Sequence, residues 1–558
     1  MSQTNFQSLV DRALRCHQRG MLAEAEQLYL QLIQSAPGLA APRHMLGVIR
    51  AQQQRHSEAL DLIGSVLAQT PDDTLALSNY ASALSALGRH GEALQCLDKA
   101  LVLLPGYPDA LNNRGNALTG LGRFGEALAS YDLAIAAQPN FALAHKNRGD
   151  ACRAMGQIVA ALACYDASLA IDPRYFEGHY ARGVALQMMG RYGEALEACD
   201  RALALDPAHA GVLNNRGGAL RDLGHLEEAL DCFRRAVALE PSLAGAHYNQ
   251  ATSLLMMEDF TQGLPLYEWR KRLPLRVEAR EYPQPLWTGR EDIAGKTLLL
   301  YVEQGLGDAI HFWRYAPLIE ARGARVLLAA DTALHRLLRS GSSTIRLLDL
   351  DGALPDFDYH SPLMSLPLAL GTTYGTIPAS ARYLAAEPER VRYWARRVGG
   401  HGWRIGIAWQ GNTAVQGSEG KSFPVAALRS IARIHGVRLI NLQKNAGAEQ
   451  LEALPPGMAV EHYRGFDDGP DAFLDSAAMM ENLDLVISSD TALAHLAGAL
   501  GVETWLALKY VPEWRWFLGH KDSAWYPSLR LFRQKMPGDW TPVFAQMETA
   551  LRQRLAAP

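Results

Sequence analysis

Small apolar residues and helix-ending residues recur with a fixed period through the first half of the chain. A proline returns every 34 residues, at Pro37, Pro71, Pro105, Pro139, Pro173, Pro207 and Pro241. An alanine lies twelve residues before each proline, at Ala25, Ala59, Ala93, Ala127, Ala161, Ala195 and Ala229. Small residues let two helices cross closely, and proline forbids further helix. The pattern predicts seven helical hairpins, and an eighth, degenerate unit in 249–270 has Gly263 at the alanine position.

The hydrophobic pattern changes after residue 270. Residues 271–296 are irregular and contain three prolines, which predicts a linker. Short apolar runs then alternate with helical stretches, first in 297–323, 324–331, 345–350 and 357–367, and again in 404–411, 437–443, 483–490 and 503–509. Continuous apolar strands between helices favour parallel sheets that are covered on both faces. We expect two Rossmann-like domains, 297–395 and 396–558, with a cleft between them at the carboxyl ends of the strands.

Composition narrows the range of partners. The 558 residues carry a formal net charge of −4 without a basic tract, so nucleic acid is not the expected partner. No apolar run reaches 18 residues and the N-terminus has no apolar core, which predicts a cytoplasmic protein without a membrane span. None of the six cysteines forms a CxxC pair or lies beyond Cys232, so we expect reduced packing residues and no metal site.

The stretch EQGLGDAIH (303–311) contains the first candidate for catalysis. Gly305 and Gly307 permit a tight strand-to-helix turn and a close approach of ligand. Asp308 opens the helix, where it serves either as a cap and dipole partner or as a general base beside the cleft. His311, one turn later, is either a second site residue or a packed helix residue.

Two further stretches predict the binding of a phosphorylated donor. Lys421, in EGKSFPVAAL (419–428), is either a solvated lysine or an ammonium that neutralises a leaving diphosphate. The stretch VISSDTALAHLAGALG (486–501) predicts a strand that runs into a helix, whose free N–H groups and dipole suit a diphosphate. Gln443 and the WQGN stretch (409–412) each end a predicted strand in the same half. They are less specific candidates for contacts in the wall of the donor site. The candidate donor-binding residues are Gly305, Gly307, Lys421, Gln443, Ser489, Asp490, Thr491, Ala492 and His495.

Asparagines occupy one register of the helical hairpins. Fourteen positions before the alanine register lie Asn79, Asn113, Asn147, Asn215 and Asn249, whereas two units have Met45 and Ala181 there. Asparagine is a poor helix-interior residue, so five in register need a physical reason. One interpretation is a simple preference of the repeat. The other is an amide ladder, whose donors and acceptors pair with the backbone of an extended acceptor chain.

The 34-residue period resembles the tetratricopeptide repeat, and the asparagine register resembles the ladder of the O-GlcNAc transferase superhelix. The three motifs of the second half resemble bacterial heptosyltransferases, with Asp308 as the base, Lys421 on donor phosphate, and Asp490 and Thr491 facing the sugar nucleotide. The resemblance implies an all-α tetratricopeptide superhelix (1–270) followed by an α/β GT-B fold.

It also implies an inverting, metal-independent glycosyltransferase that needs no cofactor beyond its nucleotide-sugar donor and acts on a protein acceptor. Two alternatives stay open. One is a tetratricopeptide scaffold with an inactive GT-B domain. The other is an enzyme that glycosylates a cell-surface or lipid-linked glycan.

Overall fold

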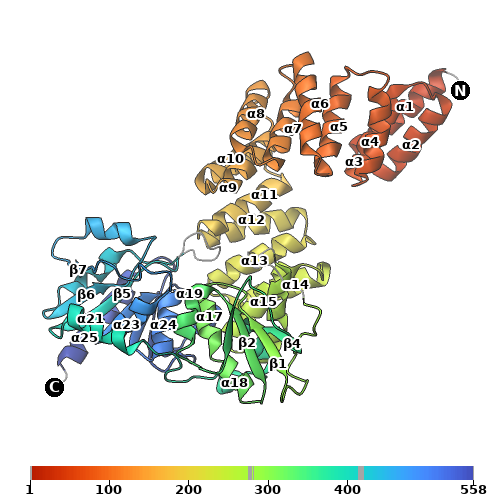
Figure 1. Cartoon of the computed structure of the whole chain (residues 1–558). Helices are drawn as coiled ribbons and strands as arrows, with labels where there is room; N and C mark the ends of the chain where they lie inside the picture. The colour runs from red at the N-terminus through yellow and green to blue at the C-terminus, as the bar shows by residue number, and fades with distance from the viewer. Residues whose placement is uncertain (1–2, 274–279, 281, 412–419, 557–558) are drawn as a thin grey trace. The chain divides into compact units, whose positions relative to one another are not determined.

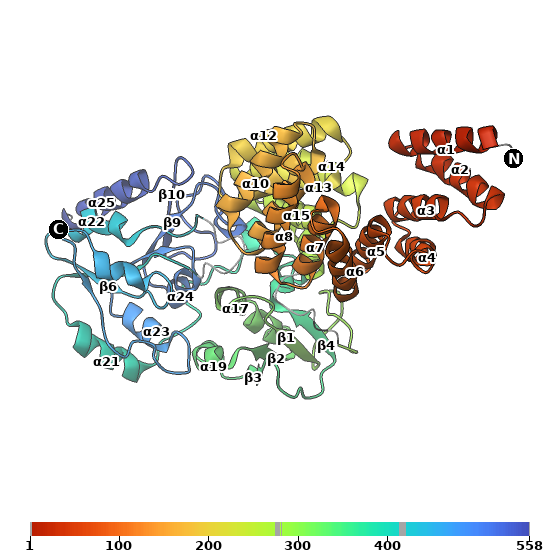
Figure 2. The same ribbon diagram turned by 90° about the horizontal axis from the view of Figure 1, so that it is seen from above.

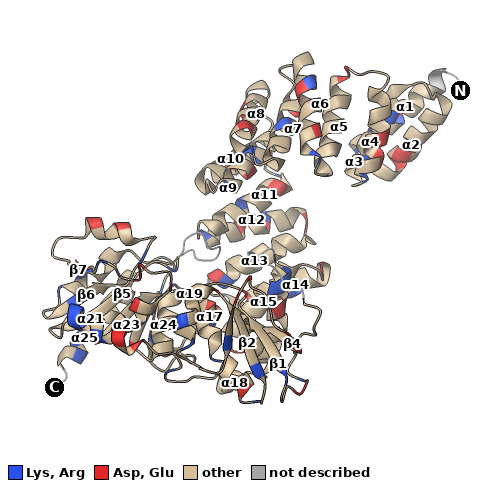
Figure 3. Cartoon of the chain, viewed as in Figure 1, with Lys and Arg blue, Asp and Glu red and all other residues tan. Residues whose placement is uncertain are grey.

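The computed structural model describes residues 3–273, 280, 282–411 and 420–556. The chain divides into two compact units, Met1–Pro207 and Ala208–Pro558, and each is described by itself (Figure 1). Acidic and basic residues are interspersed along the helices of both (Figure 3). No described helix is both long enough and apolar enough to span a membrane.

The first unit consists of helical hairpins in which each helix packs on its neighbours in sequence. Its described helices are α1 Gln3–Gln18, α2 Leu22–Ser35, α3 Ala40–Gln52, α4 His56–Leu67, α5 Thr74–Ala86, α6 His90–Leu103, α7 Pro108–Gly120, α8 Phe124–Ala137, α9 Ala142–Ala154, α10 Ile158–Ile171, α11 Phe176–Met188 and α12 Tyr192–Leu205. The register alanines are fully buried, as in Ala59 and Ala93, and each proline follows the second helix of a hairpin. The predicted helical repeat is confirmed.

The turn inside each hairpin needs a left-handed residue. Glycine supplies it in most units, as at Gly88 and Gly122, with φ of 75° and 72°. Gln54 takes the same place in its own hairpin with φ of 64°. Glycine adopts this conformation without the steric penalty that a Cβ brings, so the LGR turn of the sequence is set by backbone geometry.

The second unit begins with the last helical hairpins. These are α13 Ala210–Asp222, α14 Leu226–Leu239, α15 Ala244–Met256 and α16 Phe260–Tyr267, followed by the 3-10 helix η1 Glu268–Arg272. Gly263 stands at the alanine register because a Cβ there would lie 2.7 Å from Leu255. Buried residues of α15 and α16, such as Phe260, share one hydrophobic cluster with the sheet region that follows.

The first sheet is parallel and has the strand order β3-β2-β1-β4. Its strands are β1 Thr297–Tyr301, β2 Arg325–Ala330, β3 Arg346–Asp349 and β4 Tyr359–Pro362, and its helices include α17 Leu306–Trp313, α18 Ala316–Glu320, α19 Thr332–Leu338 and α20 Leu366–Ala369. Part of the predicted linker packs on this sheet. Trp287 is buried, and its backbone N–H donates to the carbonyl of His360 in β4 at 2.8 Å.

The second sheet is parallel with the order β10-β9-β8-β5-β6-β7. Its strands are β5 Trp403–Ala408, β6 Val437–Asn441, β7 Val460–Glu461, β8 Leu485–Ser489, β9 Thr504–Leu508 and β10 Leu529–Arg533. The helices around it include α21 Pro388–Val398, α22 Arg429–Ala432, α23 Leu474–Met480, α24 Ala492–Leu500 and α25 Thr541–Ala556, with η6 Trp514–Trp516 after β9. Numbered from β5, this is the doubly wound order 3-2-1-4-5-6. Parallel sheets are confirmed, whereas β7 and β10 were not predicted.

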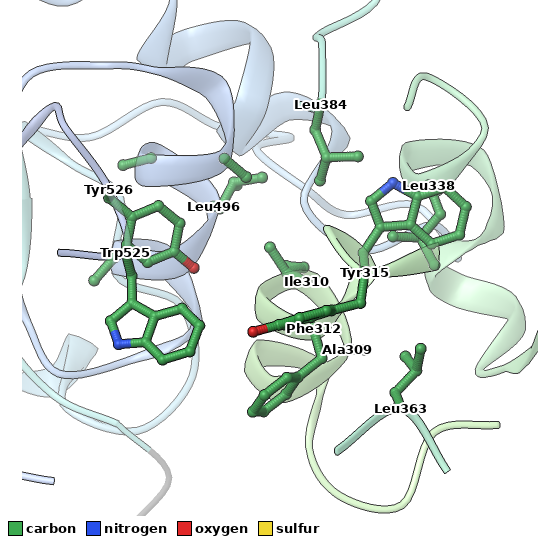
Figure 4. Packing of buried hydrophobic residues seen from close by; sticks show 14 of the residues in the cluster. Ala309, Ile310, Phe312, Tyr315, Leu338, Leu363, Leu384, Leu496, Trp525 and Tyr526 are labelled. Carbon is green, nitrogen blue, oxygen red and sulfur yellow. The ribbon is translucent and has the colours of Figure 1, made fainter. Parts of the chain in front are cut away.

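Helix α17 joins the two sheets of this unit. Figures 1 and 2 place it beside α24, and the two helices are in contact. Ile310 and Phe312 of α17 are buried in the same cluster as Trp525 and Tyr526 of the second half (Figure 4). The turn that carries Asp308 is therefore fixed against the second sheet by a shared core.

Candidate active site

A cavity of about 590 Å³ lies where the strand order of the second sheet reverses, between β5 and β8. It is lined by Leu306, Gln410, Gly411, Leu442, Gln443, Lys444, Asn445, Ala446, Asp467, Gly469, Pro470, Asp471, Ala472, Phe473, Ser476, Thr491, Ala492 and Leu493. Chain segments leave the two strands in opposite directions at such a point and open a crevice at the carboxyl ends, which is the usual ligand site of an open α/β sheet.

The start of α24 forms one wall of this cavity. Thr491 is the N-cap, with extended φ and ψ of −138° and 173°, but its side chain accepts no capping hydrogen bond. The N–H groups of Ala492 and Leu493 have no hydrogen-bond partner among the described residues. Unpaired N–H groups at the positive end of a helix dipole attract an anion, so the start of α24 suits an anionic ligand.

Lys421 and Asp490 form an ion pair at the end of β8. The Nζ of Lys421 lies 3.2 Å from Oδ2 of Asp490, whose side chain is 9% exposed. Burial by itself raises the pKa of Asp490, but the charge of the nearby Lys421 ammonium opposes this effect, and the pKa lies below its ordinary value. Burial likewise acts to lower the pKa of Lys421, and the charges of Asp490 and Glu513 outweigh it and raise the pKa. Both groups are charged at neutral pH.

Asp308 lies in the first turn of α17 and is paired with Arg515 of η6. Its Oδ1 accepts from Arg515 at 2.6 Å, and its side chain is 24% exposed. The second arm of the guanidinium donates to Glu513 at 2.5 Å. Burial raises the pKa of Glu513. These three residues, with Lys421 and Asp490, form a charged cluster at the carboxyl ends of the strands.

Gln443 lines the cavity with an amide that is already bonded to the protein. Its Oε1 accepts from the N–H of Trp409 and Gln410 at 3.1 and 3.0 Å, and its Nε2 donates to the carbonyls of Gln410 and Ala446, each at 2.8 Å. This side chain holds the loops that end β5 and β6 together. Because these bonds occupy the Gln443 amide, we expect the backbone around it, rather than its side chain, to contact a donor.

The predicted glycines serve helix packing. A Cβ on Gly307 would lie 3.2 Å from the Cα of Ala492 and 3.3 Å from His495, so Gly307 allows α17 and α24 to approach. Gly305 is the N-cap of α17 and has open space around it. Ser489 ends β8, where its buried Oγ has no hydrogen-bond partner among the described residues.

His311 and His495 lie inside the protein rather than at its surface. Their Nδ1 atoms each lie 2.9 Å from the hydroxyl of Tyr526, and His311 is fully buried. Burial, followed by nearby arginines, holds the pKa of His311 well below its ordinary value and lowers the pKa of His495 to about 3. Two neutral imidazoles that share one phenol favour packing roles, and the structure brings neither to the cavity wall.

The last repeats of the second unit lie next to the charged cluster. Helix α15 contacts η6, and Trp514 of η6 packs on Phe260 and Tyr267 at ring-centroid distances of 6.4 and 5.6 Å. On the same repeats, Oδ1 of Asn249 accepts from Arg221 at 3.1 Å and its Nδ2 donates to Asn214 at 2.9 Å.

In the first unit the asparagine register holds neighbouring repeats together. Asn113 donates to the hydroxyl of Ser78, and Asn147 donates to Asn112, both at 3.0 Å. Asn79 lies 3.0 Å from the imidazole of His44. Each amide therefore gives one hydrogen bond to the preceding repeat, which favours a structural reason for the register. A peptide-binding ladder would use the amide donors and acceptors that these bonds do not occupy.

Sequence reasoning missed Arg515, Glu513 and Tyr526. The run PEWRW (512–516) carried a signal, because an acid and a base two residues apart within an aromatic stretch are expected to be buried and paired. Of the predicted WQGN wall, Asn412 lies outside the described residues.

Comparison with protein families identifies the repeats. Models of the tetratricopeptide repeat match residues 50–112, 108–141, 149–190, 176–209 and 210–243. Protein FlbA of Caulobacter vibrioides is 28% identical over an alignment of 327 residues, and the match covers 54% of this chain and 54% of FlbA. The chain thus matches about half the length of this curated relative.

Solved structures resemble the helical part only weakly. A chain of the APC/C hetero-tetramer Cut9–Hcn1 is 16% identical with a TM-score of 0.40, over 47% of this chain and 52% of that one. PilW, a type IV pilus biogenesis factor, is 23% identical with a TM-score of 0.34, over 37% and 94%. YrrB, a tetratricopeptide protein with an unusual peptide-binding site, is 23% identical with a TM-score of 0.28, over 33% and 95%. Likenesses at these TM-scores do not indicate a function. The family models identify the first half of the chain as tetratricopeptide repeats.

Proposed function

We propose that the second unit carries a GT-B fold and that the chain is an inverting, metal-independent glycosyltransferase with a protein acceptor. One observation carries the proposal. The cavity at the reversal point of the second sheet is walled by the unpaired N–H groups of α24 and by Leu306 of the turn that holds Asp308. The proposed anion site and the turn that carries Asp308 therefore border the same cavity, although the Asp308 side chain itself is not among its lining residues.

In this proposal Asp308 takes the proton of an acceptor hydroxyl while the hydroxyl oxygen attacks the anomeric carbon. The bond from that carbon to the diphosphate breaks, and its electron pair leaves with the nucleoside diphosphate. The single displacement inverts the anomeric centre. Lys421 and the start of α24 balance the charge that develops on the leaving group.

The protein acceptor is supported by the repeats. Helix α15 contacts η6, whose Arg515 is paired with Asp308. A polypeptide bound by the last repeats would reach the carboxylate without a further domain. We therefore place the acceptor on the repeats and the donor in the cavity.

The function is tested by incubating the full-length chain with a panel of sugar nucleotides and a cell lysate, and measuring which protein gains the mass of a sugar. We expect Asp308→Asn to lose about 10²–10⁴-fold in turnover because an amide cannot take the proton. The amide oxygen still accepts from Arg515, so nucleotide binding is expected to stay near wild type. Turnover of the variant at the wild-type rate would remove Asp308 from the mechanism.

A scaffold with an inactive sheet region is the second candidate, and the family matches to the repeats favour it. Thermal unfolding in the presence of UDP, ADP, GDP or CMP distinguishes the glycosyltransferase from the scaffold. A nucleotide at 100 times its dissociation constant stabilises its binding unit by about 2.7 kcal/mol. All 11 tryptophans lie between Trp269 and Trp540, so their fluorescence follows the second unit alone. A chain that responds to none of the nucleotides and labels no protein is a scaffold.

A further inference from the structure

The carboxylate of Asp308 is held from one side only. Arg515 gives its Oδ1 a hydrogen bond of 2.6 Å, and no other described residue donates to this carboxylate. The side chain is one-quarter exposed, so Oδ2 remains open to a substrate. The position of Asp308 thus depends on where Arg515 is placed.

Arg515 itself is firmly fixed. Its side chain is 6% exposed, and its guanidinium lies 5.0 Å from the ring centroids of both Phe312 and Trp514. Glu513 accepts from its Nη1 and also from its backbone N–H, at 2.5 and 3.0 Å. A planar fork of this kind can hold two carboxylates at a set angle, which the point charge of a lysine cannot do.

The second carboxylate changes the charge of the group. A lone arginine would neutralise Asp308, whereas Arg515 is shared with Glu513. One cation then faces two carboxylates, and the trio keeps one negative charge beside the cavity when both acids are ionised. Such sharing suits a general base, because Arg515 orients Asp308 without fully neutralising its negative charge.

We propose that Arg515 is a positioning residue that fixes Oδ1 of Asp308 and thereby presents Oδ2 to the acceptor hydroxyl, with Glu513 as its counter-charge. The inference rests on the proposed function. It also connects the repeats to the chemistry, since η6 is anchored on α15 and α16 through Trp514, Phe260 and Tyr267.

The test is a double-mutant cycle in the full-length chain. Arg515→Ala is expected to lower kcat by about 10- to 100-fold with the donor KM unchanged, because displacing a catalytic group by about 1 Å costs this much. In an Asp308→Asn background the same change is expected to have no further effect on residual turnover, because Arg515 acts through Asp308. Added methylguanidine is expected to restore part of the rate of Arg515→Ala.

Two variants control for folding. Arg404→Ala removes another arginine of the second sheet that grips a carboxylate, Asp484, with bonds of 2.7 and 3.0 Å. It is expected to lower stability without changing kcat. Arg515→Lys keeps the charge but loses the fork, so it should bind donor normally and turn over slowly.

The outcomes separate this inference from the function. Labelling by the wild type and loss of labelling in Asp308→Asn, together with a wild-type kcat in Arg515→Ala and Arg515→Lys, would overturn the role of Arg515 alone. An equal loss of rate in the Asp308→Asn background would also overturn it. A wild-type chain that labels no acceptor removes both proposals.

Discussion

At the scale of single residues, two partly buried ion pairs stand out in the candidate site. Arg515 holds Asp308, which comes from the first half of the unit, and Asp490 holds Lys421 within the second half. Under the proposed function, each pair leaves one charged group, Asp308 or Lys421, for the substrate. Pairing lets ionised groups stay in a partly buried site, because removing either partner would leave an uncompensated charge.

Lys421→Ala is expected to weaken donor binding and to slow transfer together. A hydrogen bond to a charged group contributes about 1.5–3 kcal/mol, which is roughly a ten- to hundred-fold rise in the dissociation constant of the nucleotide. The change also leaves Asp490 buried without its counter-charge, so stability falls. Fluorescence-monitored unfolding and nucleotide titration measure the two effects separately.

The double variant Lys421→Ala with Asp490→Asn is the matched control. It removes both charges, so the free energy of unfolding is expected to recover while donor affinity stays low. Recovery of donor affinity in the double variant would mean that Lys421 serves only to neutralise Asp490.

At the scale of elements, the question is whether each asparagine of the register both holds neighbouring repeats together and binds a peptide backbone. Asn113 donates to Ser78 of the preceding repeat, and Asn147 donates to Asn112. An amide has two donors and an acceptor with two lone pairs, so one inter-repeat bond leaves capacity for a peptide backbone.

Asn113→Ala and Ser78→Ala separate these roles. Both remove the same inter-repeat hydrogen bond, and each is expected to lower the stability of the repeats by roughly 0.5–1.5 kcal/mol in unfolding followed by circular dichroism. Only Asn113→Ala removes the amide, so only this variant should raise KM for a protein acceptor. Equal KM values for the two variants would assign the register to repeat packing alone.

At the scale of the whole molecule, stability should depend on pH through the two buried histidines. His495 has a pKa of about 3 in the folded chain, and that of His311 is well below the ordinary 6.5. Burial is the main cause, with Arg314 and Arg515 acting in the same direction on both rings and Asp490 opposing them at His495. Below pH 6.5 the unfolded chain takes up protons that the folded chain cannot.

The stability contributed by each neutral imidazole is therefore complete above pH 6.5 and is lost as the pH falls, by about 1.4 kcal/mol per pH unit. Tryptophan-monitored unfolding between pH 7 and 5 measures this slope for the second unit. His495→Gln is expected to give a shallower slope, since glutamine takes up no proton. An unchanged slope would show that His495 is protonated in the folded chain.

Local patterns predicted the repeats and the parallel strands, because register prolines, buried alanines and apolar runs each act within a few residues. They predicted Asp308 and the start of α24 for the same reason, since both lie at strand-to-helix turns. The Asp308–Arg515 pair joins residues 207 positions apart, and the His311–Tyr526 contact joins residues 215 apart. No spacing in the sequence encodes such contacts. The short strands β7 and β10 were missed because their apolar runs are brief and stand among aromatic and polar residues.

The division at residue 207 has a consequence for how such a chain can change. The last two hairpins share their hydrophobic core with the sheets, whereas the hairpins before Pro207 form a unit of their own. Under the proposed function, duplication or loss of a 34-residue segment in that first unit would alter the length of acceptor polypeptide that the repeats hold, while the core shared by the last hairpins and the sheets stays the same. The acceptor range and the chemistry of the proposed transferase could then be selected independently, one by the number of repeats and the other by point substitution.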